Sequence, residues 1–310
     1  MKRKLIIGIK IIFTVCLFFA GFSYLGHTLM RKAKYGDWNY LIKVGNFDLI
    51  EENTMDVLFF GSSHTYCSID PVLLKEDYGI ESYVLATQQQ SLILNYHYII
   101  EALKTQSPHT IVVELFMVGR TNGYQNDEIL HDAIDVLPLS LNKIEMIQAA
   151  VPEEKRMEHY FPIIKYHSRW KELTWDDFKL DYRSWVDEDR GYVRLHQVYP
   201  TELDTTIPFG RERDLTDQEI EYLAKIEALA QENDIRLIYL YAPYPMDGNG
   251  VDYAYTLELY AEEKGVPYIN GYELLTELNY DGNTDFCDEF GHLNESGAKK
   301  LTEYLVDWIR

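Results

Sequence analysis

Two short segments hold the residue types that nucleophilic catalysis needs. Gly61-Ser62-Ser63-His64 directly follows an apolar run, and His292 stands near the C-terminus with Asp288 and Glu289 shortly before it. A serine hydroxyl becomes a nucleophile when an imidazole takes its proton, and a carboxylate orients that imidazole. The two segments together predict Ser63 as the nucleophile and His292 as its base, oriented by either acid.

The first segment falls where an open α/β sheet places its ligands, and the second lies just before the last expected helix. Short apolar runs alternate with amphipathic stretches, which predicts a mostly parallel sheet covered on both faces. The expected strands are 56–61, 82–85, 110–114, 235–241 and 266–270, and the expected helices are 92–105, 217–233, 251–264 and 295–310. Thr216 is the expected N-cap of the second helix. Ligands bind beyond the carboxyl ends of such strands, and Ser63 follows the first of them.

The stretch 126–213 breaks this alternation and is predicted to be a helical insertion over one end of the sheet. It is charged and rich in aromatic residues. They are Tyr160, Tyr166, Trp170, Trp175, Tyr182, Trp185, Tyr192 and Tyr199. Packing in the core is the interpretation we favour for them. A cleft wall on which sugar rings stack is the alternative.

The N-terminus predicts a membrane anchor. Lys2, Arg3 and Lys4 precede an apolar run over 5–30 that only Lys10 interrupts, about the length needed to span a bilayer. No small-residue cleavage site follows it, so we expect an uncleaved anchor at 1–34 and a folded domain at 35–310.

Charge and cysteine content limit the ligands. The formal net charge of -21 argues against nucleic acid as a partner, because phosphate binding needs clustered Lys and Arg. The three cysteines show no metal-ligand spacing with one another or with histidine, so we expect no metal and no cofactor. We favour unpaired thiols for Cys67 and Cys287, with a disulfide between them outside the cytoplasm as the alternative.

The paired segments resemble those of the SGNH (GDSL-like) hydrolase superfamily. Gly61-Ser62-Ser63 stands where that family has Gly-Asp-Ser, and His292 with Leu293-Asn294 resembles its closing block; the resemblance covers most of 55–310. It implies a flavodoxin-like three-layer α/β/α fold. Counting back from His292 puts Glu289 at the family's acid position, while Asp288 has the better flanking residues, and we favour Asp288.

The anchor together with Gly-Ser-Ser-His resembles a narrower branch, that of the teichoic-acid D-alanylation protein D and of alginate O-acetylation proteins. This resemblance implies an enzyme outside the cytoplasm, held at the cell membrane. It would be an O-acyl hydrolase or acyltransferase that acts on a surface polysaccharide or teichoic-acid-like polymer through an acyl-enzyme. A membrane-bound O-acyltransferase is the implied partner.

The family's oxyanion-hole residues have no clear counterpart in this sequence. Gln88 and Gln90 follow the second expected strand and are candidate donors, and Asn122 lies near the third, with a spacing that differs from the family's. The gap motivates an alternative function, a non-catalytic accessory or glycan-binding protein that partners a membrane acyltransferase.

Overall fold

A five-stranded parallel sheet forms the centre of the molecule. The computed structural model describes residues 2–30, 40–120, 125–178, 187–208 and 211–310. The strands are β1 (Val57–Gly61), β2 (Ser82–Ala86), β3 (Thr110–Glu114), β4 (Arg236–Tyr241) and β5 (Tyr268–Asn270). Their order is β2-β1-β3-β4-β5, the flavodoxin-like order. All the predicted strands are confirmed, and the fold is α/β as expected.

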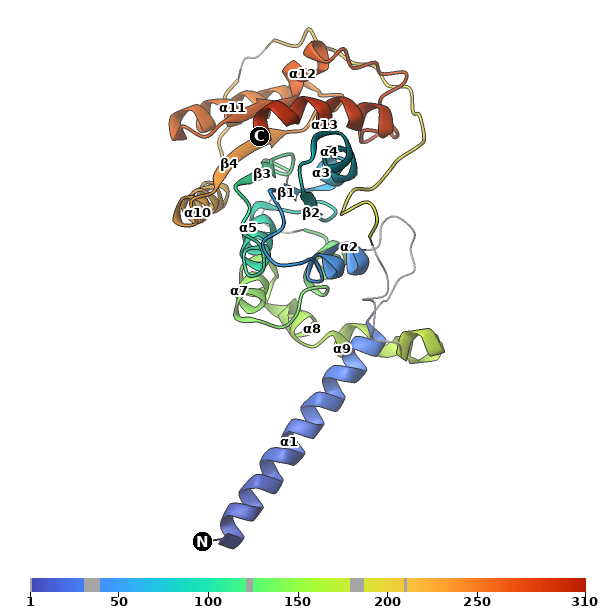
Figure 1. Cartoon of the computed structure of the whole chain (residues 1–310), viewed down its shortest axis with the longest axis vertical. Helices are drawn as coiled ribbons and strands as arrows, with labels where there is room; N and C mark the ends of the chain where they lie inside the picture. The colour runs from blue at the N-terminus through green and yellow to red at the C-terminus, as the bar shows by residue number, and fades with distance from the viewer. Residues whose placement is uncertain (1, 31–39, 121–124, 179–186, 209–210) are drawn as a thin grey trace.

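The strands are apolar along nearly their whole length because both faces of the sheet are covered. Every residue of β1, β2 and β3 is buried. The short α3 (Ser63–Tyr66) and α4 (Pro71–Tyr78) follow β1, and α5 (Leu92–Ala102) follows β2. In Figure 1 α4 lies above the strands, beside the C-terminal helix α13 (Glu295–Ile309), and α5 lies below them. The sheet is therefore the middle of three layers.

Two further helices of the sheet domain agree with the predicted periodicity. They are α10 (Asp217–Glu232), which packs on α5, and α11 (Gly248–Lys264), which packs on the edge strand β5; the short α12 (Gly271–Glu277) was not predicted. Thr216 caps α10 as predicted: its hydroxyl accepts from Glu219 N–H, and the Glu219 carboxylate accepts from the Thr216 amide. This reciprocal capping box satisfies two amide donors at the helix start.

The insertion is helical only in its first half. Its helices are α6 (Asp127–Ile134), α7 (Leu141–Ala150), α8 (Arg156–Tyr160) and α9 (Pro162–Tyr166), with 3-10 turns η2 (Glu153–Lys155), η3 (His167–Lys171) and η4 (Trp175–Phe178). The expectation of helix is wrong for residues 187–208, which are an extended strap without a helix or strand. The amides of Val193 and Tyr199 donate to carbonyls of Tyr66 and Phe286, so distant backbone replaces local helix bonds.

The aromatic residues of the insertion follow the core-packing interpretation only in part. Tyr192 is fully buried in the core, as predicted. Trp170 and Trp175 are 63% and 86% exposed, so core packing is wrong for both. Tyr182 and Trp185 lie outside the described residues.

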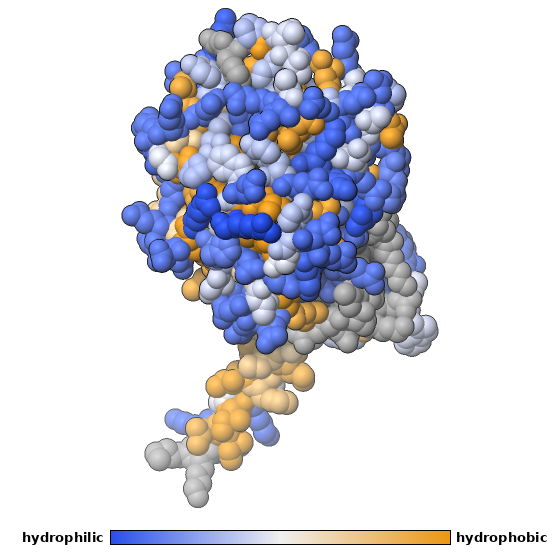
Figure 2. All heavy atoms as spheres, turned by 45° about the horizontal axis from the view of Figure 1, so that its top comes forward, coloured by the Kyte–Doolittle hydropathy of each residue, from blue (hydrophilic) through white to orange (hydrophobic). Residues whose placement is uncertain are grey.

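The first helix extends away from the domain. α1 (Lys2–Leu29) is one continuous helix, and its stretch Arg3–Gly26 is long and apolar enough to cross a membrane by length and composition. Its apolar side chains are exposed, and Figure 2 shows them as a hydrophobic stalk below a largely hydrophilic body. At its C-terminal end α1 contacts α9, η3 and η4, and α2 (Tyr40–Phe47) then leads to the sheet.

Gly61 is required where β1 turns into the site. Its φ is +152°, and an added Cβ would overlap Thr65 Oγ1 and Glu114 Cβ. We expect Gly61→Ala to lower the free energy of unfolding by about 1–3 kcal/mol, the usual cost of overpacking. Chemical denaturation of the detergent-solubilised chain measures this. Gly248→Ala is the matched control because nothing lies within 4 Å of the added Cβ. Equal effects of the two substitutions would contradict the steric argument.

Candidate active site

Ser63 lies at the topological switch point of the sheet. The chain leaves β1 toward β2 on one side, while β3 lies on the other, and sheets of this kind bind ligands at such a point. Ser62 is the N-cap of α3, and its hydroxyl accepts from the His64 amide. This cap turns the chain sharply and places Ser63 in the first position of the helix.

His292 reaches Ser63 from the other end of the chain. The Ser63 Oγ to His292 Nε2 distance is 2.8 Å, and the His292 Nδ1 to Asp288 Oδ2 distance is 2.6 Å. With Nδ1–H donating to Asp288, the Nε2 lone pair faces the Ser63 hydroxyl, which donates to it. The structure thus brings together the predicted nucleophile, base and acid.

Asp288, and not Glu289, is the acid that orients the imidazole. Its second oxygen accepts from the amides of Phe290 and His292, which holds the loop around the ring. Burial by itself raises the pKa of Asp288, but its hydrogen bonds with His292 outweigh burial, and the pKa is lowered. Glu289 is exposed on the same loop.

The loop that holds His292 is anchored to α13. The buried Asp285 accepts from Ser296 Oγ at 2.7 Å and from Lys300 Nζ at 2.8 Å. Asn294 caps α13 by accepting from two of its first amides, and its own amide donates to the Thr284 carbonyl at 2.7 Å. Because both ends of the loop are fixed to one helix, the imidazole is held in place.

A buried carboxylate behind the nucleophile was not predicted. Glu114, the last residue of β3, accepts from Ser62 Oγ at 2.9 Å and from the Phe116 amide at 2.5 Å. Burial raises its pKa from 4.5 to about 7, although these hydrogen bonds oppose the change. The sequence offered one signal, an acidic residue at the end of an otherwise apolar strand.

A second histidine lies beside His292. The His64 ring stacks on Phe116 at a centroid distance of 3.7 Å and is 4.7 Å from the His292 ring. Burial, and then the nearby His292 and Arg120, hold the pKa of His64 well below its usual value. Its ring is therefore neutral, so it does not oppose a positive charge that forms on His292.

An exposed cation borders this group. Arg120 lies over the Phe116 ring at 4.1 Å, and its guanidinium donates to the Tyr244 hydroxyl at 2.5 Å. In a chain with a net charge of -21, it is a local positive group close to the site. Neither Arg120 nor Tyr244 belongs to a recognisable sequence pattern, so folding alone brings them here.

The structure does not assign the three predicted oxyanion donors to the site as it does His292 and Asp288. The side-chain amide of Gln90 is buried and donates to the Leu85 carbonyl and to Asn95 Oδ1, so both of its protons serve the fold. Gln88 is exposed in the turn after β2. Asn122 lies outside the described residues. The Ser63 amide, in the first turn of α3, has no acceptor within that helix.

The cysteines are free thiols, as predicted. Burial, and then Cys287 and Asp288, hold the pKa of Cys67 well above its usual value. Burial and the neighbouring Asp288 raise the pKa of Cys287 to about 12. Both thiols are therefore protonated, and the thiol is the weakly nucleophilic form of cysteine.

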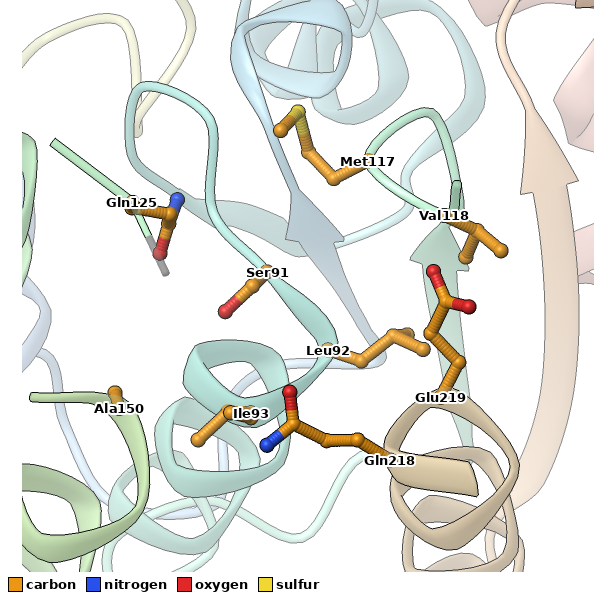
Figure 3. Close-up of a pocket in the computed structure, with 9 residues that line it drawn as sticks. All are labelled: Ser91, Leu92, Ile93, Met117, Val118, Gln125, Ala150, Gln218 and Glu219. Atoms are coloured by element: carbon orange, nitrogen blue, oxygen red, sulfur yellow. The ribbon is translucent and has the colours of Figure 1, made fainter. Parts of the chain in front are cut away.

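A small cavity on the α5 side of the sheet is separate from the catalytic group. Figure 3 shows it between the start of α5, the segment after β3 and the start of α10, with Ser91, Met117 and Glu219 in its lining. Its volume of about 20 Å³ suits ordered water. It is too small for an ester substrate.

Comparison with known proteins gives likeness of structure alone. No family model matches the chain, and no curated protein matches it in sequence. It is similar to a GDSL-like lipase from Bacteroides thetaiotaomicron, with 10% identity over 88% of this chain and 98% of that one, at a TM-score of 0.40. It is also similar to a variant of an acetyl-xylooligosaccharide esterase from Geobacillus, with 12% identity, coverage of 83% and 95%, and a TM-score of 0.40.

Asp288 and Glu289 form a natural pair of variants. We expect Asp288→Asn to lower kcat for a chromogenic acetyl ester by about 10²–10⁴-fold, because the amide no longer enforces the His292 tautomer. Glu289→Gln should leave kcat close to that of the unmodified chain. Steady-state kinetics of both variants test the assignment, and the reverse ranking would contradict it.

Glu114 predicts a pH dependence of stability. Its pKa of about 7 in the folded state exceeds its unfolded value of 4.5, so the folded state binds more protons between these values. Stability therefore falls as the pH rises through this window, by at most about 3 kcal/mol from this residue. Denaturation of Glu114→Gln across the window should show a flatter profile. Parallel profiles for the two proteins would rule out this contribution.

Proposed function

We propose that this chain is a serine-dependent O-acyl hydrolase or acyltransferase of the SGNH superfamily. The observation that carries the proposal is the continuous hydrogen-bonded line from Ser63 through His292 to Asp288, at 2.8 Å and 2.6 Å. Its position at the carboxyl ends of β1 and β3 agrees with where open α/β sheets bind ligands.

The reaction follows from this line. Ser63 Oγ attacks the ester carbonyl while His292 Nε2 takes the hydroxyl proton, and Asp288 stabilises the imidazolium. When the carbon–oxygen bond of the ester breaks, His292 returns that proton to the leaving alcohol, and the acyl group stays on Ser63. His292 then deprotonates water or an acceptor hydroxyl, which removes the acyl group and restores the serine.

We place the chain at the cell membrane with its catalytic domain outside the cytoplasm. The segment that packs against α1 supports an anchor, because α9, η3 and η4, and α8 just before them, carry exposed apolar side chains. They are Met157, Ile164, Trp170, Trp175 and Phe178. Tryptophan is enriched where proteins meet the membrane–water interface, so the exposed indoles fit that position better than a sugar-binding wall.

The substrate we propose is an O-acylated cell-surface polysaccharide or a teichoic-acid-like polymer. Arg120 beside the site fits a polymer that carries anionic groups, which the rest of this acidic chain would repel. A membrane-bound O-acyltransferase is the proposed partner when the acyl group is transferred rather than hydrolysed. Anchoring both proteins in one membrane would raise their effective concentration.

Replacement of the nucleophile tests the proposal. We expect Ser63→Ala in the detergent-solubilised full chain to lower acetyl-ester turnover by about 10³-fold or more and to abolish labelling by a fluorophosphonate probe. Labelling should also require His292.

Ser68→Ala is the matched control. Ser68 is buried five positions further along the same segment, and its hydroxyl has no hydrogen-bond partner within the described residues. Its turnover and labelling should equal those of the unmodified chain. Absence of both signals in the unmodified chain would instead favour the non-catalytic accessory function.

A further inference from the structure

Two buried histidines face each other in the helical insertion, away from the catalytic residues. His131 of α6 and His159 of α8 stack with a centroid distance of 3.9 Å and an interplanar angle of 13°. Their exposed fractions are 2% and 1%. Within the described part of the chain, Nε2 of each ring is buried without a hydrogen-bond partner. Two neighbouring polar nitrogens that are buried without hydrogen bonds lower the stability of the fold.

The other nitrogen of each ring is held by one carboxylate. Asp135 accepts from His131 Nδ1 at 2.7 Å through one oxygen and lies 3.3 Å from His159 Nδ1 through the other. Tyr166 also donates to Asp135, at 2.9 Å. A carboxylate that receives Nδ1–H leaves Nε2 of the ring available to a metal, as in many histidine sites. In the stack the two Nε2 lone pairs run parallel, and because Asp135 holds His159 less closely than His131, the His159 ring can turn and direct its lone pair at the same ion.

Carboxylates lie on the open side of the two rings. One oxygen of Asp127 and one nitrogen of each ring all lie within 4.8 Å of one another. The Glu158 carboxylate is 3.8 Å from His131 Nε2. Lys155 and Lys165 pair loosely with Asp127, at 3.7 Å and 3.6 Å. These distances exceed those of close ion pairs, so the lysines leave the Asp127 oxygen able to bind a stronger cation.

We propose that His131, His159 and Asp127 bind a zinc ion, with a water molecule as the fourth ligand. Two imidazole nitrogens with a carboxylate oxygen form a ligand set typical of zinc, whereas calcium and magnesium prefer oxygen alone. Asp135 is the positioning residue behind both imidazoles. The proposal does not depend on the function proposed for Ser63.

The metal would join two segments that are distant in sequence. α6 and α8 contribute the ligands, and α8 leads directly into α9, which packs against α1. An ion between α6 and α8 therefore stabilises the part of the insertion that supports the N-terminal helix. It binds the folded state alone, so it raises the unfolding temperature by mass action.

The test measures zinc on the full chain, purified in detergent without a histidine tag. We expect one zinc per chain by elemental analysis after equilibration and removal of free metal. Cobalt substitution should give the visible absorption of a tetrahedral site with nitrogen ligands. Asp127→Asn and His159→Gln should weaken zinc binding at least tenfold, measured by competition with a chromophoric chelator. Asp135→Asn should weaken it by about 10–100-fold, the usual effect of losing such a positioning residue.

Two controls separate this site from other sources of zinc. His167→Gln alters an exposed histidine of the same insertion whose Nδ1 bonds to a backbone carbonyl, and it should keep full zinc affinity. Cys287→Ser removes one member of the other group with metal-ligand distances, Cys287, Asp288 and His292. It too should keep the affinity.

Three results would overturn the proposal. In the first, the unmodified chain binds no zinc at any concentration at which it stays in solution. In the second, His159→Gln and His167→Gln bind zinc with equal affinity. In the third, Cys287→Ser is the one variant that loses zinc. Circular dichroism of each variant verifies the fold. Asp127→Asn changes a partly exposed side chain and keeps the test valid if a buried histidine variant unfolds.

Discussion

The hydrogen bond between Ser63 and His292 joins residues that are 229 positions apart, and the functional geometry depends on it. Neither residue is placed by its neighbours alone. Ser63 is positioned by the end of β1 and the cap of α3, while His292 is positioned by a loop tied to α13. A parallel sheet makes their meeting possible, because all of its strands end at the same edge. The helices on both faces stabilise that edge. The 2.8 Å hydrogen bond between Ser63 and His292 therefore depends on the folding of the whole domain.

Two carboxylates near this contact serve different purposes because their environments differ. Asp288 interacts with an imidazole and backbone amides, and its pKa is lowered despite partial burial, so it remains charged. Glu114 is fully buried behind Ser62, and burial raises its pKa to about 7. The first can stabilise a positive charge on His292, and the second is a structural acceptor that fixes the turn at Gly61. Divergent environments of this kind are how proteins assign separate roles to chemically similar groups.

The insertion connects the sheet domain with the N-terminal helix. Its α9, η3 and η4 contact the end of α1, and these elements carry exposed apolar residues. The extended strap then returns along the sheet domain, and its backbone bonds to Tyr66 and to Phe286, close in sequence to Ser63 and His292. One continuous stretch of chain therefore contacts both the proposed anchor and the loops of the site.

Most of the sheet domain was determined by the sequence itself. Short apolar runs between amphipathic stretches specify buried parallel strands of three to six residues, and Thr216 with Glu219 specifies where α10 begins. Ser63 and His292 were identifiable because Gly-Ser-Ser at a strand end and a histidine before the last helix are local patterns. The length and apolar composition of α1 could likewise be recognised from the sequence.

Only the tertiary structure decided between Asp288 and Glu289, since adjacent residues on a loop point in different directions and no periodicity separates them. It also brought Glu114, His64 and Arg120 to the site, and it showed that the amide of Gln90 is engaged within the fold. The cluster of Asp127, His131 and His159 likewise requires α6 and α8 to pack together. The physical reason is common to all of them. Hydrogen bonds and ligand distances are set in three dimensions to fractions of an ångström, and sequence spacing constrains such distances only within a single helix or turn.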